Sequence, residues 1–186
     1  MMTLVIGGSG SGKSAYAESL LDGYKRKYYL ATMLAEDEQA RQKVNRHRRM
    51  RAGKGFVTIE QPRDIARAAG AFGQTGDGGL KDGTCPKSAL LECVSNLVAN
   101  EMFLPTGMVQ EDVVAHKVLE EIGLLRETLD ELVIVSNNVF EDGIHYDEST
   151  MAYLRALAAV NAGLAQMAER VTEVVVGIPV VIKDKL

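Results

Sequence analysis

The segment VIGGSGSGKSAY, residues 5–16, carries the pattern that decides the fold. It matches G-x-x-x-x-G-K-[ST] through Gly7, Gly12, Lys13 and Ser14, and it lies between an apolar run and a segment of helical period. Glycines let the chain curl so that successive backbone N–H groups point at phosphate oxygens, and the following helix presents its positive end. We expect a triphosphate-binding loop in which Lys13 reaches the β- and γ-phosphates and the Ser14 hydroxyl binds Mg²⁺. The alternative, an ordinary Gly-rich turn, is disfavoured by the complete pattern in this context.

Outward from this loop, short apolar runs alternate with segments of helical period. The runs are rich in Val, Ile, Leu and Tyr, and their near-continuous apolarity indicates strands buried on both faces, as in a parallel sheet. The expected strands are residues 3–7, 28–32, 89–93, 131–137 and 173–177, with shorter ones at 56–60 and 179–183. The expected helices are 13–22, 36–51, 62–72, 94–103, 111–130 and 148–170, the last with Met151, Leu154, Ala158, Leu164 and Met167 on one side.

This order of elements predicts an α/β protein with a mostly parallel sheet flanked by helices. We expect one domain over residues 1–186, and a short C-terminal strand antiparallel to 173–177. Residues 73–87 are rich in Gly and polar residues without periodicity, so an exposed mobile loop is expected there.

The composition limits the possible partners. Hydrophobic residues make up 46% of the chain and charged ones 25%, which is typical of a globular protein. The formal charge of -4 argues against a general nucleic-acid binder. No run approaches the length of a membrane span, and Cys85 and Cys93 lack the spacing of a metal or redox pair, so a cytoplasmic protein with reduced thiols is expected.

Glu92 ends the apolar run ALLEC and is the candidate partner of the bound nucleotide or its Mg²⁺. An acidic side chain that ends a buried strand is costly without a charged partner, and such a carboxylate binds the metal directly or through water. The alternative is that Glu92 is only the acidic residue before the helix expected at 94–103. Cys93 beside it is expected to be a small core residue rather than a nucleophile.

His47 lies among arginines in KVNRHRRMR, residues 43–51. One interpretation is a solvated basic helix face. The other is a phosphate-binding cluster in which the imidazole attacks phosphorus while guanidiniums stabilise the transition state. His116 is expected to face solvent, and His145 is a weaker candidate for a substrate contact, in a loop before a helix that Asp147 caps.

Taken together, these segments resemble the bifunctional adenosylcobinamide kinase/adenosylcobinamide-phosphate guanylyltransferase family, nearly from end to end. The segments that carry the resemblance are GGSGSGKS (7–14), YLAT (29–32), NRHRRMRAGKGFVTIEQP (45–62), LLECVSNLVANEMF (91–103), VIVSNNVFEDGI (133–144) and VNAGLAQMAERVTEVVVGIPVVIK (160–183). The phosphate loop is shared by many unrelated enzymes, whereas the histidine and LLEC segments make the match specific.

The resemblance implies a RecA-like P-loop fold, commonly assembled as a trimer. It also implies phosphorylation of adenosylcobinamide with ATP or GTP, followed by transfer of GMP from GTP through a guanylylated histidine, which is His47 here. Lys13 and His47 are then the catalytic residues, and Ser14 and Glu92 bind Mg²⁺. The nucleotide contacts are the loop residues Gly7, Gly8, Ser9, Gly10, Ser11, Gly12, Lys13 and Ser14, together with Ala31, Thr32, Met33, Arg48, Arg49, Met50, Arg51, Glu60 and Glu92.

The sequence departs from the family pattern beside the cleft. Members commonly have Glu and Gly where this chain has Asn138 and Phe140, and the final helix lacks an Arg and Asp that are often present. These positions border the cleft, so the departures bear on the substrate range and on the balance between the two half-reactions rather than on the nucleotide chemistry. Two alternatives stay open: a P-loop kinase for another small alcohol, and a GTP-binding regulatory protein that has lost catalysis through changes such as Asn138.

Overall fold

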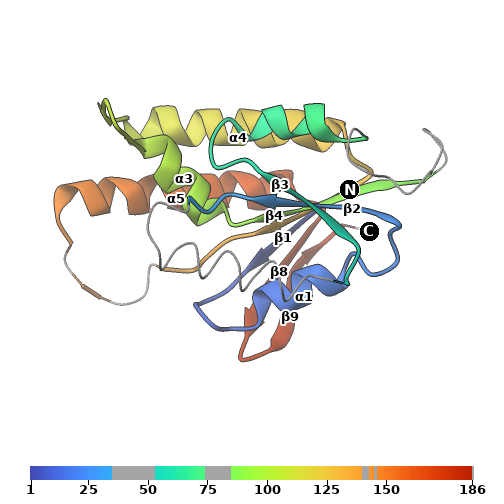
Figure 1. Ribbon diagram of the computed structural model, residues 1–186. Helices are drawn as coiled ribbons and strands as arrows, with labels where there is room; N and C mark the ends of the chain where they lie inside the picture. The colour runs from blue at the N-terminus through green and yellow to red at the C-terminus, as the bar shows by residue number, and fades with distance from the viewer. Residues whose placement is uncertain (35–52, 74–84, 140–142, 145, 186) are drawn as a thin grey trace.

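The computed structural model describes residues 1–34, 53–73, 85–139, 143–144 and 146–185, and its centre is a seven-stranded sheet (Figure 1). The strand order is β3-β2-β4-β7-β1-β8-β9. The strands are β1 (Met2–Ile6), β2 (Arg26–Ala31), β3 (Phe56–Glu60), β4 (Lys87–Glu92), β7 (Glu131–Val135), β8 (Arg170–Val175) and β9 (Ile178–Asp184).

Strands β1 to β8 of this sheet pair in parallel, and β9 alone is antiparallel, as the sequence predicted. A hairpin turn at Gly177, with φ at 81°, joins β8 to β9 at the edge of the sheet. Since the other six strands run the same way, their carboxyl ends meet at one edge. That edge holds the loop that follows β1 and the ends of β2, β3 and β4.

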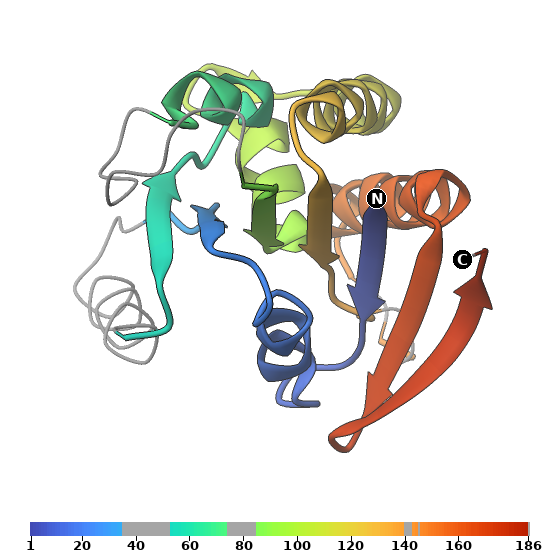
Figure 2. The same ribbon diagram turned by 90° about the vertical axis from the view of Figure 1, so that its right-hand side faces the viewer.

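Helices cover both faces of the sheet (Figure 2). They are α1 (Lys13–Ser19), the 3₁₀-helix η1 (Ile65–Ala71), α3 (Val94–Met102), α4 (Glu111–Glu127) and α5 (Glu148–Met167). Residues of α1 pack with Val5, Leu90 and Val133 on one face, whereas η1, α3, α4 and α5 pack with Leu4 and Leu91 on the other. This alternation of inward residues gives two apolar cores, as expected for strands buried on both faces.

Several predicted boundaries are wrong. The segment predicted as a helix at 62–72 forms the 3₁₀-helix η1, and β8 begins at Arg170, within the range predicted as helix. A small hairpin of β5 (Phe103–Leu104) and β6 (Gly107–Met108) follows α3 and was not predicted.

The predicted inner face of α5 is also wrong. Its buried residues are Ala152, Ala156, Leu157, Val160 and Leu164, so only Leu164 of the predicted set is buried. The buried face is marked by Leu157, Val160 and Leu164, at helical spacing, together with two alanines, and the predicted set left out the first two of these large residues. The helix expected at 36–51 and the loop expected at 73–87 lie wholly or mostly outside the described residues. Among the described helices, none combines the length and apolarity that crossing a membrane requires.

Candidate active site

The loop between β1 and α1 is shaped by glycines and held by the β8–β9 turn. Gly10 and Gly12 have φ of 72° and 92°, the left-handed region that favours glycine. A Cβ on Gly12 would lie 3.3 Å from the Gly177 Cα. The Gly177 N–H donates to the Ser11 carbonyl oxygen at 2.8 Å. The turn at the sheet edge therefore fixes the curl of the loop from outside.

Lys13 begins α1 and is held close to this loop. Its residue is 8% exposed, and its ammonium donates to the Gly8 carbonyl oxygen at 2.9 Å. Burial lowers the pKa of Lys13, while the nearby Cys93 and Glu92 oppose that shift. The fold thus holds a poorly hydrated cation inside the loop, where an anion is the favourable partner.

The Glu92 carboxylate lies directly opposite Ser14. The Ser14 hydroxyl donates to Glu92 Oε1 at 2.5 Å, and the Tyr29 hydroxyl donates to Glu92 Oε2 at 2.9 Å. The structure therefore brings together the two residues that the sequence named as metal ligands. A hydroxyl and a carboxylate oxygen are the ligand types that Mg²⁺ takes in nucleotide sites, so this donor set fits that ion.

The ends of β2 and β3 bring further predicted residues to the same edge. Ala31 is in register with Glu92 on one side and with Glu60 on the other. Thr32 follows Ala31, and its hydroxyl donates to the Cys93 carbonyl oxygen at 2.9 Å and accepts from the Cys93 N–H at 2.8 Å. Ala31 and Thr32 thus lie beside Glu92, whereas Glu60 is exposed and lies on the far side of Ala31, and Met33 directly follows Thr32.

A polar network that the sequence did not predict joins the ends of β4 and β7. Ser95 is its centre: its hydroxyl accepts from the Asn137 amide at 2.6 Å and lies 3.0 Å from Cys93 Sγ. The Tyr153 hydroxyl donates to the Ser95 carbonyl oxygen at 3.2 Å. Burial raises the pKa of Tyr153 to about 12, so this phenol stays a neutral donor. Cys93 is half-buried beside this network.

Several predicted site residues lie outside the described residues: His47, Arg48, Arg49, Met50, Arg51, Phe140 and His145. Asn138 is described, and its N–H donates to the Gly7 carbonyl oxygen at 3.1 Å. The predicted cap is confirmed, because the Asp147 side chain accepts from the Thr150 N–H at 3.1 Å. His116 faces solvent as predicted, with 84% of its side chain exposed.

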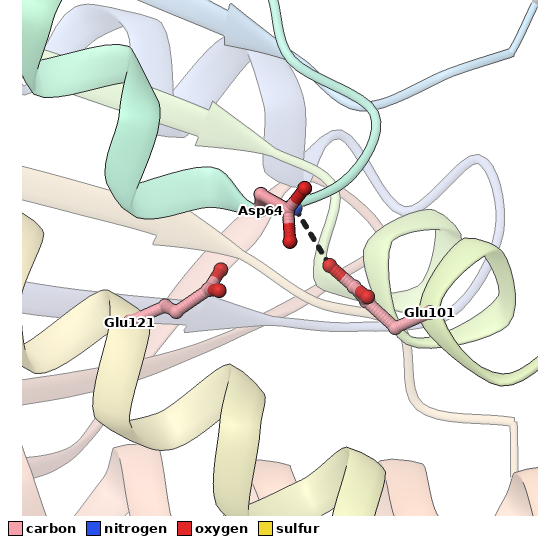
Figure 3. A group of neighbouring side chains, drawn as sticks. All are labelled: Asp64, Glu101 and Glu121. Carbon is pink, nitrogen blue, oxygen red and sulfur yellow. Dashed lines mark hydrogen bonds between the residues drawn. The ribbon is translucent and has the colours of Figure 1, made fainter. Parts of the chain in front are cut away.

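Away from this site, a cluster of three carboxylates lies between η1, α3 and α4 (Figure 3). Carboxylate oxygens of Asp64, Glu101 and Glu121 lie within 4.8 Å of one another, and Glu101 Oε1 accepts from the Asp64 backbone N–H at 2.7 Å. The Lys117 ammonium donates to Asp64 at 2.7 Å and to Glu101 at 2.5 Å, and lies 3.8 Å from Glu121. The cation of this cluster is therefore a lysine of the same chain.

Comparison with known proteins adds a family match over almost the whole chain. Residues 3–182 match the family described as cobinamide kinase / cobinamide phosphate guanyltransferase. The chain is 30% identical to the bifunctional adenosylcobalamin biosynthesis protein CobU of Escherichia coli K12, over 98% of this chain and 100% of that protein. It is 26% identical to the protein CobP of the same description from Pseudomonas aeruginosa, over 100% of this chain and 99% of that protein.

Among solved structures, the fold is similar to that of an ATPase domain. The TM-score is 0.56 at 11% identity, and the match covers 92% of this chain and 68% of that one. Together with the sheet order, this likeness confirms the predicted RecA-like P-loop fold.

Proposed function

Since the chain belongs to the cobinamide kinase / cobinamide phosphate guanyltransferase family, we propose that it phosphorylates adenosylcobinamide and then converts the phosphate to adenosylcobinamide-GDP. One P-loop domain over residues 1–186 serves both reactions. ATP or GTP gives the phosphoryl group in the first step, and GTP gives GMP in the second. The observation that carries the proposal is the meeting of Ser14 with Glu92 beside the buried Lys13.

In the kinase step, the backbone of residues 7–14 cradles the phosphates. Lys13 lies buried in that loop, and its ammonium moves from the Gly8 carbonyl to the γ-phosphate oxygens, where negative charge spreads in the transition state. Ser14 and Glu92 would hold Mg²⁺, which would supply positive charge to offset the negative charge of the phosphates. Ala31, Thr32, Met33 and Glu60, at the same edge of the sheet, contact the nucleotide.

In the guanylyl step, an imidazole nitrogen of His47 attacks the α-phosphorus of GTP. The new P–N bond forms as the bond to the β-phosphate oxygen breaks, and pyrophosphate leaves. A phosphate oxygen of adenosylcobinamide phosphate then attacks the same phosphorus, and the P–N bond breaks. Arg48, Arg49, Met50 and Arg51 flank the nucleotide, with the guanidiniums stabilising the transferred phosphoryl charge. This assignment rests on the resemblance of residues 45–62, because His47 lies outside the described residues.

We propose a homo-oligomer, a trimer by resemblance, acting in the cytoplasm on GTP, ATP and adenosylcobinamide. Size-exclusion chromatography with light scattering measures the number of chains in the assembly directly.

The test of the guanylyl step is the intact mass of the protein after incubation with GTP and Mg²⁺. The parent chain is expected to gain one GMP through a bond that is labile to acid and stable to base. His47→Ala abolishes this adduct, whereas the matched control His116→Ala, at an exposed position of α4, keeps it. A His47→Ala protein that gains GMP as the parent does would overturn the assignment of the nucleophile.

If the parent forms no adduct, two further measurements separate the two alternatives. Turnover of ATP on an alcohol other than the corrinoid would favour a simpler kinase. Tight GTP binding without transfer to any acceptor would favour a regulatory protein.

A further inference from the structure

Tyr28 and Tyr29 are adjacent on β2, and their side chains lie on opposite faces of the sheet. The Tyr29 ring is 3% exposed and packs in the core beneath α1, edge-on to Phe56 with ring centroids 6.2 Å apart. The Tyr28 ring packs on the other face, with centroids 4.6 Å from Phe72. Each hydroxyl is anchored: Tyr29 donates to Glu92 Oε2 at 2.9 Å, whereas the Tyr28 hydroxyl accepts from the Gly73 N–H at 2.9 Å.

The two oxygens of the Glu92 carboxylate accept hydrogen bonds from different donors. Oε2 receives the phenol from the core side, and Oε1 receives the Ser14 hydroxyl from the loop side. The terminal torsion of a glutamate is broad, so a carboxylate with one partner can rotate over a wide range. A rigid donor on Oε2 removes that freedom, because the Tyr29 ring is fixed by its packing on all sides.

We propose that Tyr29 is a positioning residue that holds the Glu92 carboxylate with Oε1 directed at Ser14, and so sets the affinity of the site for Mg²⁺ and nucleotide together. The proposal deepens the proposed function and rests on it. Partners that orient a metal ligand change metal affinity or activity by about 10–100-fold when removed. The Tyr29 hydroxyl is expected to act within this range without touching substrate.

The test compares two variants that each lose one hydroxyl from neighbouring positions, Tyr29→Phe and Tyr28→Phe. Calorimetry uses a GTP analogue whose α–β bridging oxygen is replaced by methylene, which cannot transfer GMP, and measures its dissociation constant in Mg²⁺ and in EDTA. The constant in EDTA divided by the constant in Mg²⁺ reports the Mg²⁺ linkage without any turnover. Tyr29→Phe is expected to lower this ratio about tenfold and to leave the constant in EDTA unchanged. Tyr28→Phe leaves both constants at the parent values, and denaturant midpoints show that both variants are folded.

A double-mutant cycle shows whether Tyr29 acts through Glu92. Glu92→Gln is expected to lower the Mg²⁺ linkage by itself, and adding Tyr29→Phe then lowers it no further. An equal loss in both backgrounds would show that the hydroxyl acts elsewhere and would overturn the inference.

The outcomes separate this inference from the proposed function. A Tyr29→Phe protein with the parent's Mg²⁺ linkage overturns the inference alone, provided that the parent phosphorylates adenosylcobinamide. A parent that binds GTP equally in Mg²⁺ and EDTA overturns the metal role of Ser14 and Glu92, and the inference with it.

Discussion

Lys13 and Lys117 are two lysines beside acidic side chains, and their surroundings differ in what compensates the charge. Lys117 donates to two carboxylates and lies near a third. Lys13 donates to a neutral acceptor, the Gly8 carbonyl oxygen, although Glu92 is near enough to influence it. The charge of Lys117 is therefore compensated within the protein, and we call Lys117 with Asp64, Glu101 and Glu121 the closed cluster. The charge of Lys13 is only partly compensated and is left for a ligand, and we call Lys13 with its loop and Glu92 the open site.

The pKa directions of the two lysines agree with this difference. Burial lowers the pKa of Lys13, and the nearby acidic groups do not reverse the shift. Burial also opposes the charge of Lys117, but the hydrogen bonds to Asp64 and Glu101 outweigh it and raise its pKa. The raised pKa means that Lys117 stabilises the fold fully below its unfolded pKa and loses that effect as the pH rises through the folded pKa. The lowered pKa of Lys13 is a cost to the fold, and we expect a bound phosphate to offset it.

The largest expected effect follows from removing the cation of the open site. Lys13→Ala is expected to lower kcat for phosphorylation of adenosylcobinamide by roughly a hundredfold or more, because a buried donor to transition-state charge is lost. The free energy of unfolding stays the same or rises slightly, since a poorly hydrated ammonium has been removed. Steady-state kinetics and urea unfolding measure the two quantities. Undiminished turnover would end the assignment of Lys13.

The closed cluster is expected to behave in the opposite way. Lys117→Met leaves the carboxylates of Asp64, Glu101 and Glu121 without their shared donor, and Glu101 is buried. We expect a loss of about 2 kcal/mol in the free energy of unfolding, after allowance for the partial exposure of Lys117, with kcat for phosphorylation unchanged.

Lys54 provides the matched control for this loss. It forms a salt bridge with Glu18, and 47% of its side chain is exposed. Lys54→Met is expected to change the free energy of unfolding by less than about 0.5 kcal/mol. If Lys54→Met and Lys117→Met destabilise equally, the cluster is no more than an ordinary surface pair.

The sequence predicted the fold well because strand burial and the phosphate-loop pattern are local signals. Each run of Val, Ile, Leu and Tyr predicted as a strand is a strand of the sheet, and the C-terminal pair is antiparallel as expected. The small hairpin at 103–108 was missed because two-residue strands carry too little pattern to detect. The inner face of α5 was misplaced because most positions of this helix are apolar or small, so more than one face carries apolar residues at helical spacing.

The candidate site was predicted only where a residue's chemistry and its place in an element coincide. Glu92 stood out as an acid ending an apolar strand, and the structure places it against Ser14. Tyr29 did not stand out, although it lies in the YLAT segment that resembles the family, because a strand that is apolar on both faces does not reveal which of two tyrosines faces the loop. Ser95 and Asn137 are joined only by the pairing of β4 with β7, which no local pattern contains.

The smallest effect expected from a change within the cluster of Asp64, Glu101, Glu121 and Lys117 tests whether charge is the source of its stability. The hydrogen bond from Lys117 lowers the pKa of Asp64, against the opposing effect of burial, so the carboxylate stabilises the fold above its unfolded pKa and loses that effect as the pH falls through the folded pKa. Asp64 has φ of 49°, a conformation that asparagine also tolerates, so Asp64→Asn removes the charge with little strain.

We expect Asp64→Asn to be less stable than the parent by about 0.5 kcal/mol near pH 7. Urea unfolding followed from about pH 7 to about pH 2 should show this difference shrinking below about pH 4 as Asp64 of the parent protonates. A difference that stays constant over the whole range would show that the side chain acts through its shape rather than its charge, and would remove the distinction between the closed cluster and the open site on which the comparison of Lys117 with Lys13 rests.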